Sequence, residues 1–437
     1  MTKTFRDWVP EQSTLLPASV LDWVGAGHLV HFVTALVKEQ LDLAAIENSY
    51  SEARGYPPYD PRMMVALLMY AYCQGIYSSR RIARACEERI DFMALTARQE
   101  PDFRTIALFR LRHLEALKGL FGQVLKLCRK AGLVKLGHVA LDGTKIRANA
   151  NKHKSMSYAG MKRSEEKLKA EIADWFAKAN LADQQEDELY GTDKRGDELP
   201  DWVKDKTKRL EKIRQAKAEL EAEAKAASEA PPDPKKTGHK SKPTGVPEDK
   251  AQRNFTDPDS KIQKSPDGYL QGYNGQLAVD EKSQVIVAQL VTASSPDVEQ
   301  LRPVIEKLEL SLGRRPKKVL ADAGYWSESN VRHLEAQQIE PLIAPGRMKH
   351  NTPAPSSPRG RTPAGLTAKE LMWRKLRTKQ GHADYARRKA IVEAPFGQIK
   401  QARGFRQFLR RGLEQVQQEW ALICTAHNLL KLRAVWA

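Results

Sequence analysis

The sequence predicts a mixed α/β fold, in which a helical N-terminal region precedes a sheet of short strands. Three observations predict it. Apolar residues recur at helical spacing up to about residue 135, β-rich segments begin at residue 134, and a long charged helical stretch at 155–228 interrupts them. The chain has 437 residues, enough for two or three domains with a sizeable core.

The charge balance favours a polyanionic partner. The chain carries 72 Lys and Arg residues against 54 Asp and Glu residues, a formal net charge of +18. Such an excess attracts polyanions over long range, and DNA or RNA is the usual one. An anionic membrane surface is the alternative, but the sequence has neither a long apolar run nor a basic amphipathic anchor.

Cysteine usage and the N-terminal residues favour the cytoplasm. The four cysteines are scattered and form no CxxC pair, so we do not expect a thiolate zinc site. Buried free thiols suit a reducing compartment. The residues MTKTFRDWVPEQ at the N-terminus contain no apolar core of a signal peptide.

Residues 1–135 are predicted to form a compact helical bundle. Prolines near position 60 interrupt the chain ahead of helical runs at 62–78, 78–90 and 105–133. No clear strand occurs in this region, and a bundle is the usual way for such helices to bury their apolar faces.

Strands are predicted at 134–141, at 269–280 and at 284–293, and a further apolar strand ends at Asp322. The short polar segment before residue 284 suits a hairpin turn. Asp297 is expected to cap the helix that separates the third strand from the fourth. Three antiparallel strands continued by a helix and another strand are typical of the ribonuclease-H-like fold.

The charged stretch at 155–228 is predicted to be an antiparallel helical hairpin with its turn at 191–200, followed by a mobile Pro- and Lys-rich linker at 229–250. Lys217 interrupts its heptad-like pattern. The apolar residues at heptad-like positions are Leu210, Ile213, Leu220 and Ala224.

Two aspartates stand at the ends of predicted strands. Asp142 follows an apolar strand in VALDGTK, and Asp322 follows another in VLADAGY. Active sites form at strand ends because side chains there leave the core and converge. Gly143 and Gly324 follow closely and would let backbone or substrate approach. One such aspartate would ordinarily start a turn, but two in a basic chain favour a functional site.

Glu393 is the third candidate acid. Pro395 can occupy the first turn of a helix, which would place Glu393 at a helix N-terminus, where negative charge is favoured. Lys400 lies seven residues later, on the same helical face. A solvated basic helix is the alternative, but the flanking apolar residues indicate a half-buried segment.

Three carboxylates suit hard divalent cations. Mg²⁺ prefers oxygen ligands, and two such ions about 3.5 to 4 Å apart can activate a hydroxyl and stabilise a leaving oxygen. The ten histidines form no HxH or HxxxH pair. We therefore expect Asp142, Asp322 and Glu393 to be both catalytic and metal-binding, with two Mg²⁺ ions, or Mn²⁺ in their place.

These residues resemble the DDE transposases of bacterial insertion sequences. The resemblance rests on Asp142 in a DGT context, Asp322 in a D-x-G-Y context, and Glu393 in a Y-R-E-K signature that ends at Lys400. The segments YDPRMMVALLMYAYCQGIYSSRRI and PDFRTIALFR are similar to the InsH-type N-terminal domain. LDGTKIRANANK and GYNGQLAVD are similar to the IS-eleven-eighty-two group, and the resemblance covers nearly the whole chain.

The remaining signature positions match less closely. Gly324 and Tyr325 complete the D-x-G-Y motif. Tyr385 and Arg388 keep the spacing that the signature expects between its Tyr and Arg, but both lie one position early. Lys389 occupies the position of the signature Arg.

The resemblance implies a division of the chain. Residues 1–135 would form an InsH-like domain for DNA-end binding or dimerisation, and residues 136–437 a ribonuclease-H-like catalytic domain. Within it, 151–265 would be a charged helical insertion with a flexible linker.

The resemblance also implies an activity and its partners. The protein would cleave DNA strands at insertion-sequence ends and transfer them into target DNA. Its partners would be double-stranded terminal inverted repeats, target DNA and a second copy in a synaptic homodimer. It would act in the cytoplasm, on the bacterial nucleoid, with no membrane partner.

Basic residues are expected to contact DNA phosphates. The stretch 381–437 carries 10 basic and 4 acidic residues, and Arg80, Arg81, Arg110 and Arg112 are candidates for recognising inverted repeats. The residues expected to hold DNA in the catalytic domain are Lys145, Arg147, Arg388, Lys389, Lys400, Arg403, Arg406, Arg410 and Arg411.

Three alternatives remain open from the sequence. One is a catalytically inert, transposase-derived DNA-binding regulator. Another is a ribonuclease-H-like repair or RNA-degrading nuclease. A structural coiled-coil protein is the third, although it would leave the acid-bearing β segments unexplained.

Overall fold

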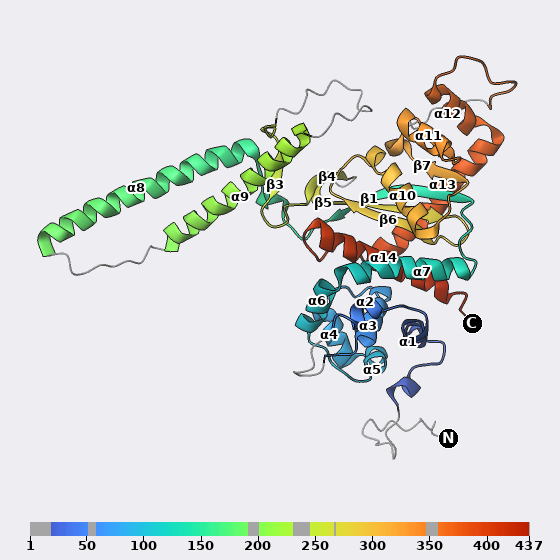
Figure 1. Cartoon of the computed structure of the whole chain (residues 1–437), viewed down its shortest axis with the longest axis horizontal. Helices are drawn as coiled ribbons and strands as arrows, with labels where there is room; N and C mark the ends of the chain where they lie inside the picture. The colour runs from blue at the N-terminus through green and yellow to red at the C-terminus, as the bar shows by residue number, and fades with distance from the viewer. Residues whose placement is uncertain are drawn as a thin grey trace, which may run out of the picture.

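The computed structural model describes residues 19–50, 58–190, 201–229, 245–265, 268–346 and 357–436. Its mixed α/β architecture confirms the predicted fold class: N-terminal helices pack under a central sheet, and a long helical hairpin projects from the body (Figure 1). The predicted hairpin turn and most of the predicted linker lie outside the described residues. No described helix is both long and apolar enough to cross a membrane.

The N-terminal region is helical throughout its described part. Asp60 caps α3, and Pro61 occupies its first turn, where a proline is tolerated. The single helix predicted for 105–133 is wrong, because the chain breaks at His113, whose buried ring contacts the Tyr50 hydroxyl. The helices are α1 Leu29–Glu39, α2 Ala44–Glu47, α3 Pro61–Cys73, α4 Ser79–Glu88, α5 Ile90–Thr96, α6 Phe103–Arg112 and α7 Leu114–Lys130.

The main sheet has the order β6-β5-β1-β7-β8, and β4 pairs with β5 beyond the end of β6. β1 is antiparallel to β5 and parallel to β7, and β7 is parallel to β8. Three strands fall where the sequence predicted them, whereas β4 and β8 were not predicted. The bounds predicted for the first strand, 134–141, are wrong, because pairing with β5 continues β1 to Arg147 and places Asp142 inside the strand. The strands are β1 His138–Arg147, β4 Lys261–Ser265, β5 Gly268–Asp280, β6 Ile286–Thr292, β7 Lys318–Ala321 and β8 Glu340–Ile343.

Helices cover both faces of this sheet. A Cβ atom on Gly143 would meet Asp297, which directly precedes α10 (Leu301–Leu312), whereas one on Gly275 would meet Trp420 of α14 (Leu413–Arg433). Because neighbouring residues of a strand point to opposite faces, α10 and α14 lie on opposite sides of the sheet. The remaining helices of this half are α11 Glu328–Ala336, α12 Ala368–Arg377 and α13 Lys379–Gly397.

α14 lies between the sheet and the N-terminal helices, and its side chains are buried around most of its circumference. Its Asn428 side chain exchanges two hydrogen bonds with the backbone of Ile286, which satisfies an edge position of β6. One continuous apolar core therefore runs from the N-terminal helices through α14 into the sheet. The change from helices to strands near residue 135 does not separate two cores.

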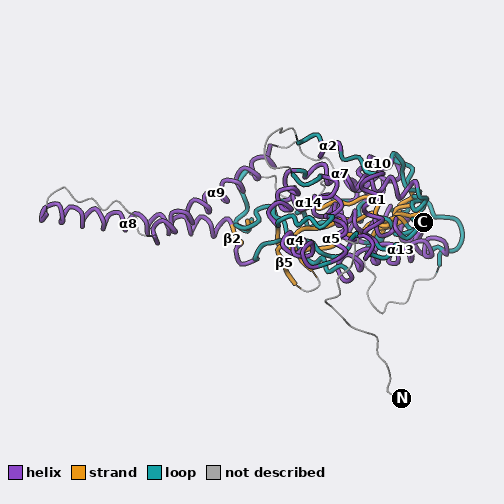
Figure 2. Tube along the Cα trace, turned by 90° about the horizontal axis from the view of Figure 1, so that it is seen from below, coloured by secondary structure: helices purple, strands orange, loops and turns teal. Residues whose placement is uncertain are grey.

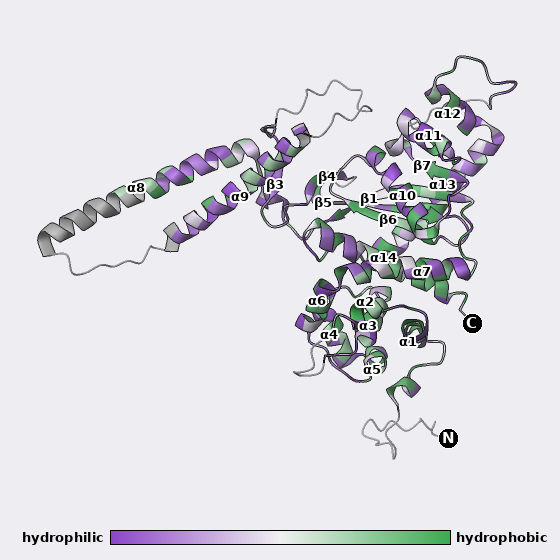
Figure 3. Cartoon of the chain, viewed as in Figure 1, coloured by the Kyte–Doolittle hydropathy of each residue, from purple (hydrophilic) through white to green (hydrophobic). Residues whose placement is uncertain are grey.

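The hairpin has a core of its own. α8 (Tyr158–Tyr190) and α9 (Asp201–Glu229) run antiparallel and extend far from the body (Figure 2). Lys217, which interrupts the heptad pattern, pairs across the hairpin with Glu165 at 2.6 Å. Figure 3 contrasts the mainly hydrophilic α9 with the apolar strands of the sheet. The core residues of the hairpin are Tyr158, Met161, Leu168, Leu210, Ile213, Ala216 and Leu220.

The hairpin joins the body through a small two-stranded sheet. β2 (Ser155–Ser157) pairs antiparallel with β3 (Gln252–Asn254), so the two ends of the insertion lie next to one another. Arg253 adds ion pairs to Glu219 and Glu223 of α9. These contacts fix the base of the hairpin close to the end of β1.

Candidate active site

Asp142, inside β1, and Asp322, directly after β7, lie at the same level of adjacent strands. Leu141 of β1 pairs with Ala321 of β7 in parallel register, and each aspartate is the next residue. Neighbouring strands lie about 4.8 Å apart, so the two backbones present their carboxylates side by side. The sequence prediction that these two acids converge is consistent with this register. Asp322 also accepts a 2.8 Å hydrogen bond from the Gly324 amide, which opens a short 3-10 helix.

The carboxylate of Asp142 is largely enclosed. Its Oδ1 accepts a hydrogen bond from the Gly143 amide at 2.8 Å, and its Oδ2 lies 3.4 Å from Nη1 of Arg388. Burial is the main reason that the pKa of Asp142 rises to about 6. The nearby negative charges of Asp322 and Asp297 raise this pKa further, and the Arg388 guanidinium opposes them.

Asp297 belongs to this site, and its predicted role as a helix cap is wrong. Pro296 holds the cap position, and no side chain caps the short 3-10 helix Asp297–Glu299. Instead, Oδ1 of Asp297 accepts hydrogen bonds from Asn274 at 2.7 Å and from Gln276 at 2.8 Å. Lys145 lies 3.4 Å from the same oxygen. Nothing in the sequence indicated this placement beyond an acid after a predicted strand.

The glycines after the two aspartates make room for Asp297. A Cβ atom on Gly143 would lie 2.3 Å from Nε2 of Gln276 and 2.8 Å from Oδ1 of Asp297. A Cβ atom on Gly324 would lie 3.4 Å from Oδ2 of Asp297. The approach expected from the D-G and D-x-G patterns is therefore made by another carboxylate of the same chain.

Two buried amides and a phenol form a hydrogen-bonded layer next to the carboxylates. Asn274 and Gln276 on β5 are almost fully buried, and the Tyr325 hydroxyl donates to Oε1 of Gln276. Burial keeps the pKa of Tyr325 well above its usual value, so the phenol remains a donor. Oδ1 of Asn274 has no hydrogen-bond partner among the described residues and lies 3.1 Å from the Cβ position at Gly143.

Glu393 lies near the end of α13, and its predicted place at a helix N-terminus is wrong. Pro395 is inside this helix rather than in its first turn, and it cannot donate to the Ile391 carbonyl. The helix passes into a π-helical turn at Gln398–Ala402. Glu393 is exposed, not half-buried, and its carboxylate joins no hydrogen bond or ion pair in the part of the chain that the structure describes.

α13 and the π-helical turn after it nevertheless bring three other side chains to β1. Besides Arg388, its Tyr385 lies with its ring 5.9 Å from that guanidinium, and burial raises the pKa of this phenol. Lys400, in the π-helical turn, donates to the Thr144 hydroxyl and to the Lys145 carbonyl. The pair that lies one position early in the signature is thus the pair that faces the aspartates.

The acids fit a hard divalent cation only in part. Asp142, Asp322 and Asp297 bring like charges together, and a cation would relieve their repulsion. Oxygen ligands are also those that Mg²⁺ prefers. Within the described ranges, however, no group of three or more Asp, Glu, His or Cys side chains is placed to hold one ion. In this arrangement, Glu393 does not complete a ligand set.

Two arginines proposed for DNA contact are structural, and those predictions are corrected. Arg403 is 9% exposed, and its guanidinium donates to the Ile423 carbonyl. Arg110 is 4% exposed and donates to the Tyr72 hydroxyl and the Tyr77 carbonyl. Buried guanidinium groups that satisfy carbonyls cannot reach a phosphate.

The other basic residues expected to hold DNA differ in whether their side chains are exposed or already hydrogen-bonded within the protein. Arg410 is partly buried and donates to the Ala107 carbonyl, and Lys145 donates to the Ser295 carbonyl. The residues whose side chains are exposed are Arg147, Lys389, Arg406 and Arg411.

Aspartates side by side on adjacent parallel strands, in a strongly basic α/β protein, suit an enzyme that acts on nucleic acids. Comparison with known families specifies the class: residues 237–429 match the Transposase DDE domain, and residues 18–112 match a Transposase domain (DUF772). These matches support a DDE transposase of a bacterial insertion sequence. The matched DDE range contains Asp322 and Glu393 but begins after Asp142.

A curated relative points to the same family. The chain is 34% identical over 87 residues to a putative transposase for insertion sequence element IS402 from Burkholderia cepacia. The similarity covers 18% of this chain and 41% of that protein, so the chain spans about two fifths of the relative's length. No solved structure matches the chain.

Proposed function

We propose that this protein cleaves DNA strands at the ends of an insertion sequence and joins them to target DNA. The observation that carries the proposal is the register that places Asp142 and Asp322 side by side on the adjacent parallel strands β1 and β7. The sheet order β6-β5-β1-β7-β8, antiparallel on one side of β1 and parallel on the other, supports a ribonuclease-H-like catalytic domain at 136–437. The hairpin and its flanks, 151–265, would be an insertion in that domain.

Asp142 and Asp322 are the residues that would hold divalent ions, Mg²⁺ or Mn²⁺. Glu393 would supply the third carboxylate from the helix that also carries Arg388. Two such ions, when bound, supply an activated hydroxyl and a stabilised leaving oxygen at a phosphodiester. A first cut would leave a 3′-hydroxyl, and that hydroxyl would attack the target strand in a direct transesterification.

The other side chains of the site would orient their neighbours and neutralise charge. Arg388 pairs with Asp142 before DNA arrives and is close enough to take a phosphate oxygen afterwards. Asp297, fixed by Asn274 and Gln276, holds Lys145 beside the strand. We assign Asp297 a positioning role, because its acceptor Oδ1 is occupied by neighbouring donors.

The exposed basic side chains are the ones that would contact the DNA partners. Lys389, Arg406 and Arg411 would contact phosphates in the catalytic half, together with Lys400. Arg80 and Arg81 on α4 are exposed and would contact the terminal inverted repeats. Two copies of the chain would bring two ends together in a synaptic homodimer on the bacterial nucleoid.

The test uses a plasmid that carries the DNA flanking the gene, with Mg²⁺ or Mn²⁺ supplied. Asp142→Asn, Asp322→Asn and Glu393→Gln should each abolish strand cleavage while a mobility-shift assay shows unchanged DNA binding. Asp297→Asn should lower cleavage by about 10- to 100-fold and raise the metal concentration for half-maximal rate. Glu335→Gln, an exposed acid on α11, is the matched control and should behave as the wild type.

Three results would overturn parts of this proposal. Cleavage that survives in one acid variant removes that residue from the catalytic set. A wild-type protein that binds these ends without metal-dependent cleavage would be a regulator. Cutting that does not depend on the ends and yields no joined product would indicate a repair nuclease.

A further inference from the structure

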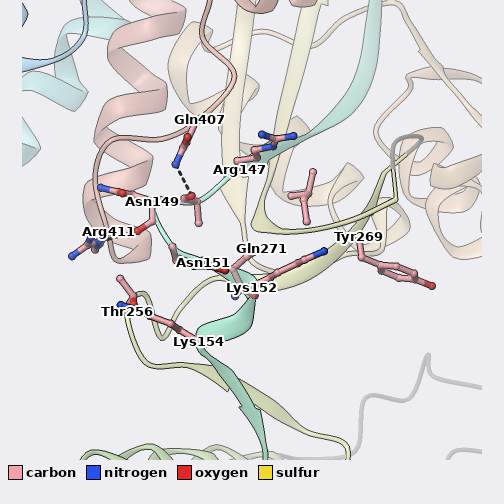
Figure 4. Close-up of a pocket in the computed structure, with 13 residues that line it drawn as sticks. Arg147, Asn149, Asn151, Lys152, Lys154, Thr256, Tyr269, Gln271, Gln407 and Arg411 are labelled. Atoms are coloured by element: carbon pink, nitrogen blue, oxygen red, sulfur yellow. Dashed lines mark hydrogen bonds between the residues drawn. The ribbon is translucent and has the colours of Figure 1, made fainter.

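A basic groove lies beyond the end of β1, away from the carboxylates. It has a volume of about 590 Å³ and is formed by the loop after β1, the start of β5 and the segment that precedes α14 (Figure 4). No Asp or Glu is among the residues that line it. Its four basic side chains are Arg147, Lys152, Lys154 and Arg411.

The positive charge of this groove is not neutralised by the fold. Arg147, Lys152 and Lys154 are exposed, and none of them pairs with a carboxylate in the described parts of the chain. Arg411 donates to the Asn149 carbonyl, and its charge is partly offset by the nearby Asp257, so Arg147, Lys152 and Lys154 carry the uncompensated charge. Uncompensated cations in a concave wall concentrate an anionic ligand.

The wall of the groove is held by hydrogen bonds in the absence of a ligand. The Gln407 side chain donates to the Ala148 carbonyl at 3.1 Å, drawn as the dashed line in Figure 4, and Asn149 donates to the Leu409 carbonyl at 2.9 Å. The backbones of Arg147 and Phe408 are joined at 2.9 Å. The chain after β1 is thus fixed against the segment before α14, so binding would require little ordering.

An exposed aromatic ring stands at the rim. Tyr269 is 66% exposed near the start of strand β5, where it pairs with Lys264 of β4. Leu270 lines the groove beside it. An aromatic ring next to a basic wall is the combination on which unpaired bases stack, and each stacked base contributes about 1 to 3 kcal/mol.

The groove lies within reach of DNA at the carboxylates. Arg147 follows Asp142 by five residues of the same strand, a distance of about 17 Å. That distance corresponds to about five base pairs of duplex rise. A strand cut at Asp142 would therefore reach the groove within half a helical turn.

We propose that this groove binds a locally unpaired DNA strand next to the cleavage point, with its phosphates on Arg147, Lys152 and Lys154 and a base stacked on Tyr269. The inference rests on the proposed function and names where the strand leaves the site. The basic side chains would bind the phosphates of the unpaired strand. The ring of Tyr269 would distinguish a single strand, whose bases can stack on it, from a duplex.

The experiment measures binding of a fluorescein-labelled single strand and of the matching duplex to the full chain by anisotropy, without divalent metal, over a range of KCl. The triple variant Arg147→Ala, Lys152→Ala, Lys154→Ala should flatten the slope of log K against log salt for the single strand by about 2, since each lost phosphate contact removes about 0.7. Its matched control is the triple variant Lys130→Ala, Arg314→Ala, Lys317→Ala, which removes the same charge near the opposite end of β1 and should leave the slope unchanged.

Tyr269 is tested separately. Tyr269→Ala should weaken single-strand binding by about 5- to 150-fold, the equivalent of one stacked base, and leave duplex binding nearly unchanged. Tyr269→Phe retains the ring and should bind as the wild type. Equal weakening of single strand and duplex by Tyr269→Ala would overturn the stacking.

The remaining outcomes also decide whether the groove is the binding site. An unchanged slope in the groove variant, or an equal loss in the control variant, would overturn the groove as the binding site. If the triple variant fails to fold, Lys152→Ala with Lys154→Ala gives the same comparison, because both side chains are exposed. Binding is measured without metal, so retained cleavage in Asp142→Asn, which would contradict the proposed catalytic role, would leave this result intact, and the two proposals fail independently.

Discussion

Gly143 and Gly324 accompany the two aspartates because a third carboxylate occupies the space beside them. Asp297 packs against the backbone of both glycines, although it is distant from both motifs in the chain. A Cβ atom at Gly143 would overlap side chains that hydrogen bonds hold in place. Packing at the site therefore requires the glycine at 143, whereas a Cβ atom at Gly324 would lie 3.0 Å from Oδ1 of Asp322 and only in ordinary contact with Asp297.

Gly143→Ala should lower strand cleavage much more than it lowers stability. The new methyl group must displace Gln276 and Asp297, and overpacking of this kind costs about 1 to 3 kcal/mol. The measurements are chemical denaturation and cleavage of end-containing plasmid. Gly137→Ala is the control, because nothing lies within 4 Å of its Cβ position and its backbone is not left-handed. Equal cleavage by the two variants would contradict the packing argument.

Local pattern predicted part of this site, and distant packing determined the rest. Asp142 and Asp322 could be predicted because each follows a short apolar run that is visible in the sequence, although β1 continues past Asp142 to Arg147. Asp297 was not, because its place depends on how a short 3-10 helix lies over β5. Glu393 was misplaced because a proline after it suggested a helix start, whereas the helix had begun at Lys379.

Among the elements, α14 has the most buried polar side chains, and each is matched to a fixed partner. Gln418 donates to the Arg110 carbonyl, and Asn428 pairs with the Ile286 backbone. His427 donates from Nε2 to the Gln284 carbonyl at 2.9 Å. Burial lowers the pKa of His427 to about 3, so the folded protein holds this ring neutral.

His427 should make the protein less stable as the pH falls below about 6.5. The unfolded chain binds a proton there at its usual pKa and the folded chain does not, so free energy of unfolding is lost as the pH falls from 6.5 toward 3. At pH 5 the loss is about 2 kcal/mol. His427→Gln keeps a hydrogen-bond donor and should remove this dependence of the free energy of unfolding on pH. Parallel stability–pH curves for the two proteins between pH 5 and 7 would contradict the assignment.

Strand prediction succeeded where an apolar run ended at recognisable turn residues and failed where no such signal marked the strand. β1, β5, β6 and β7 were predicted because apolar runs ended at turn residues. β8 has four residues, and β4 alternates too few apolar residues to be seen. These strands exist because they pair with neighbours that the local sequence does not reveal.

At the scale of the molecule, the hairpin and the body have separate cores. The apolar residues of α8 and α9 form their own cluster, and the chain enters and leaves through the paired strands β2 and β3. Ser157 and Gln252 are directly paired there.

Replacing residues 158–251 by Asn-Gly should therefore leave the body folded. A two-residue turn can join antiparallel partners without displacing them. The expected melting temperature lies within a few degrees of that of the full chain, as measured by calorimetry. A body that aggregates or melts much earlier would show that the hairpin contributes to the main core after all.

The buried position of α14 also bears on how the protein is made. This helix follows in the chain every helix and strand that it contacts, including α7, which ends at Lys130 almost three hundred residues earlier. The ribosome therefore extrudes the N-terminal helices long before the surface that covers them exists. Those helices must wait with apolar residues exposed, which makes the nascent chain a client for chaperones. A prematurely terminated message would yield a fragment that proteases remove, so that only full-length translation delivers a protein able to persist.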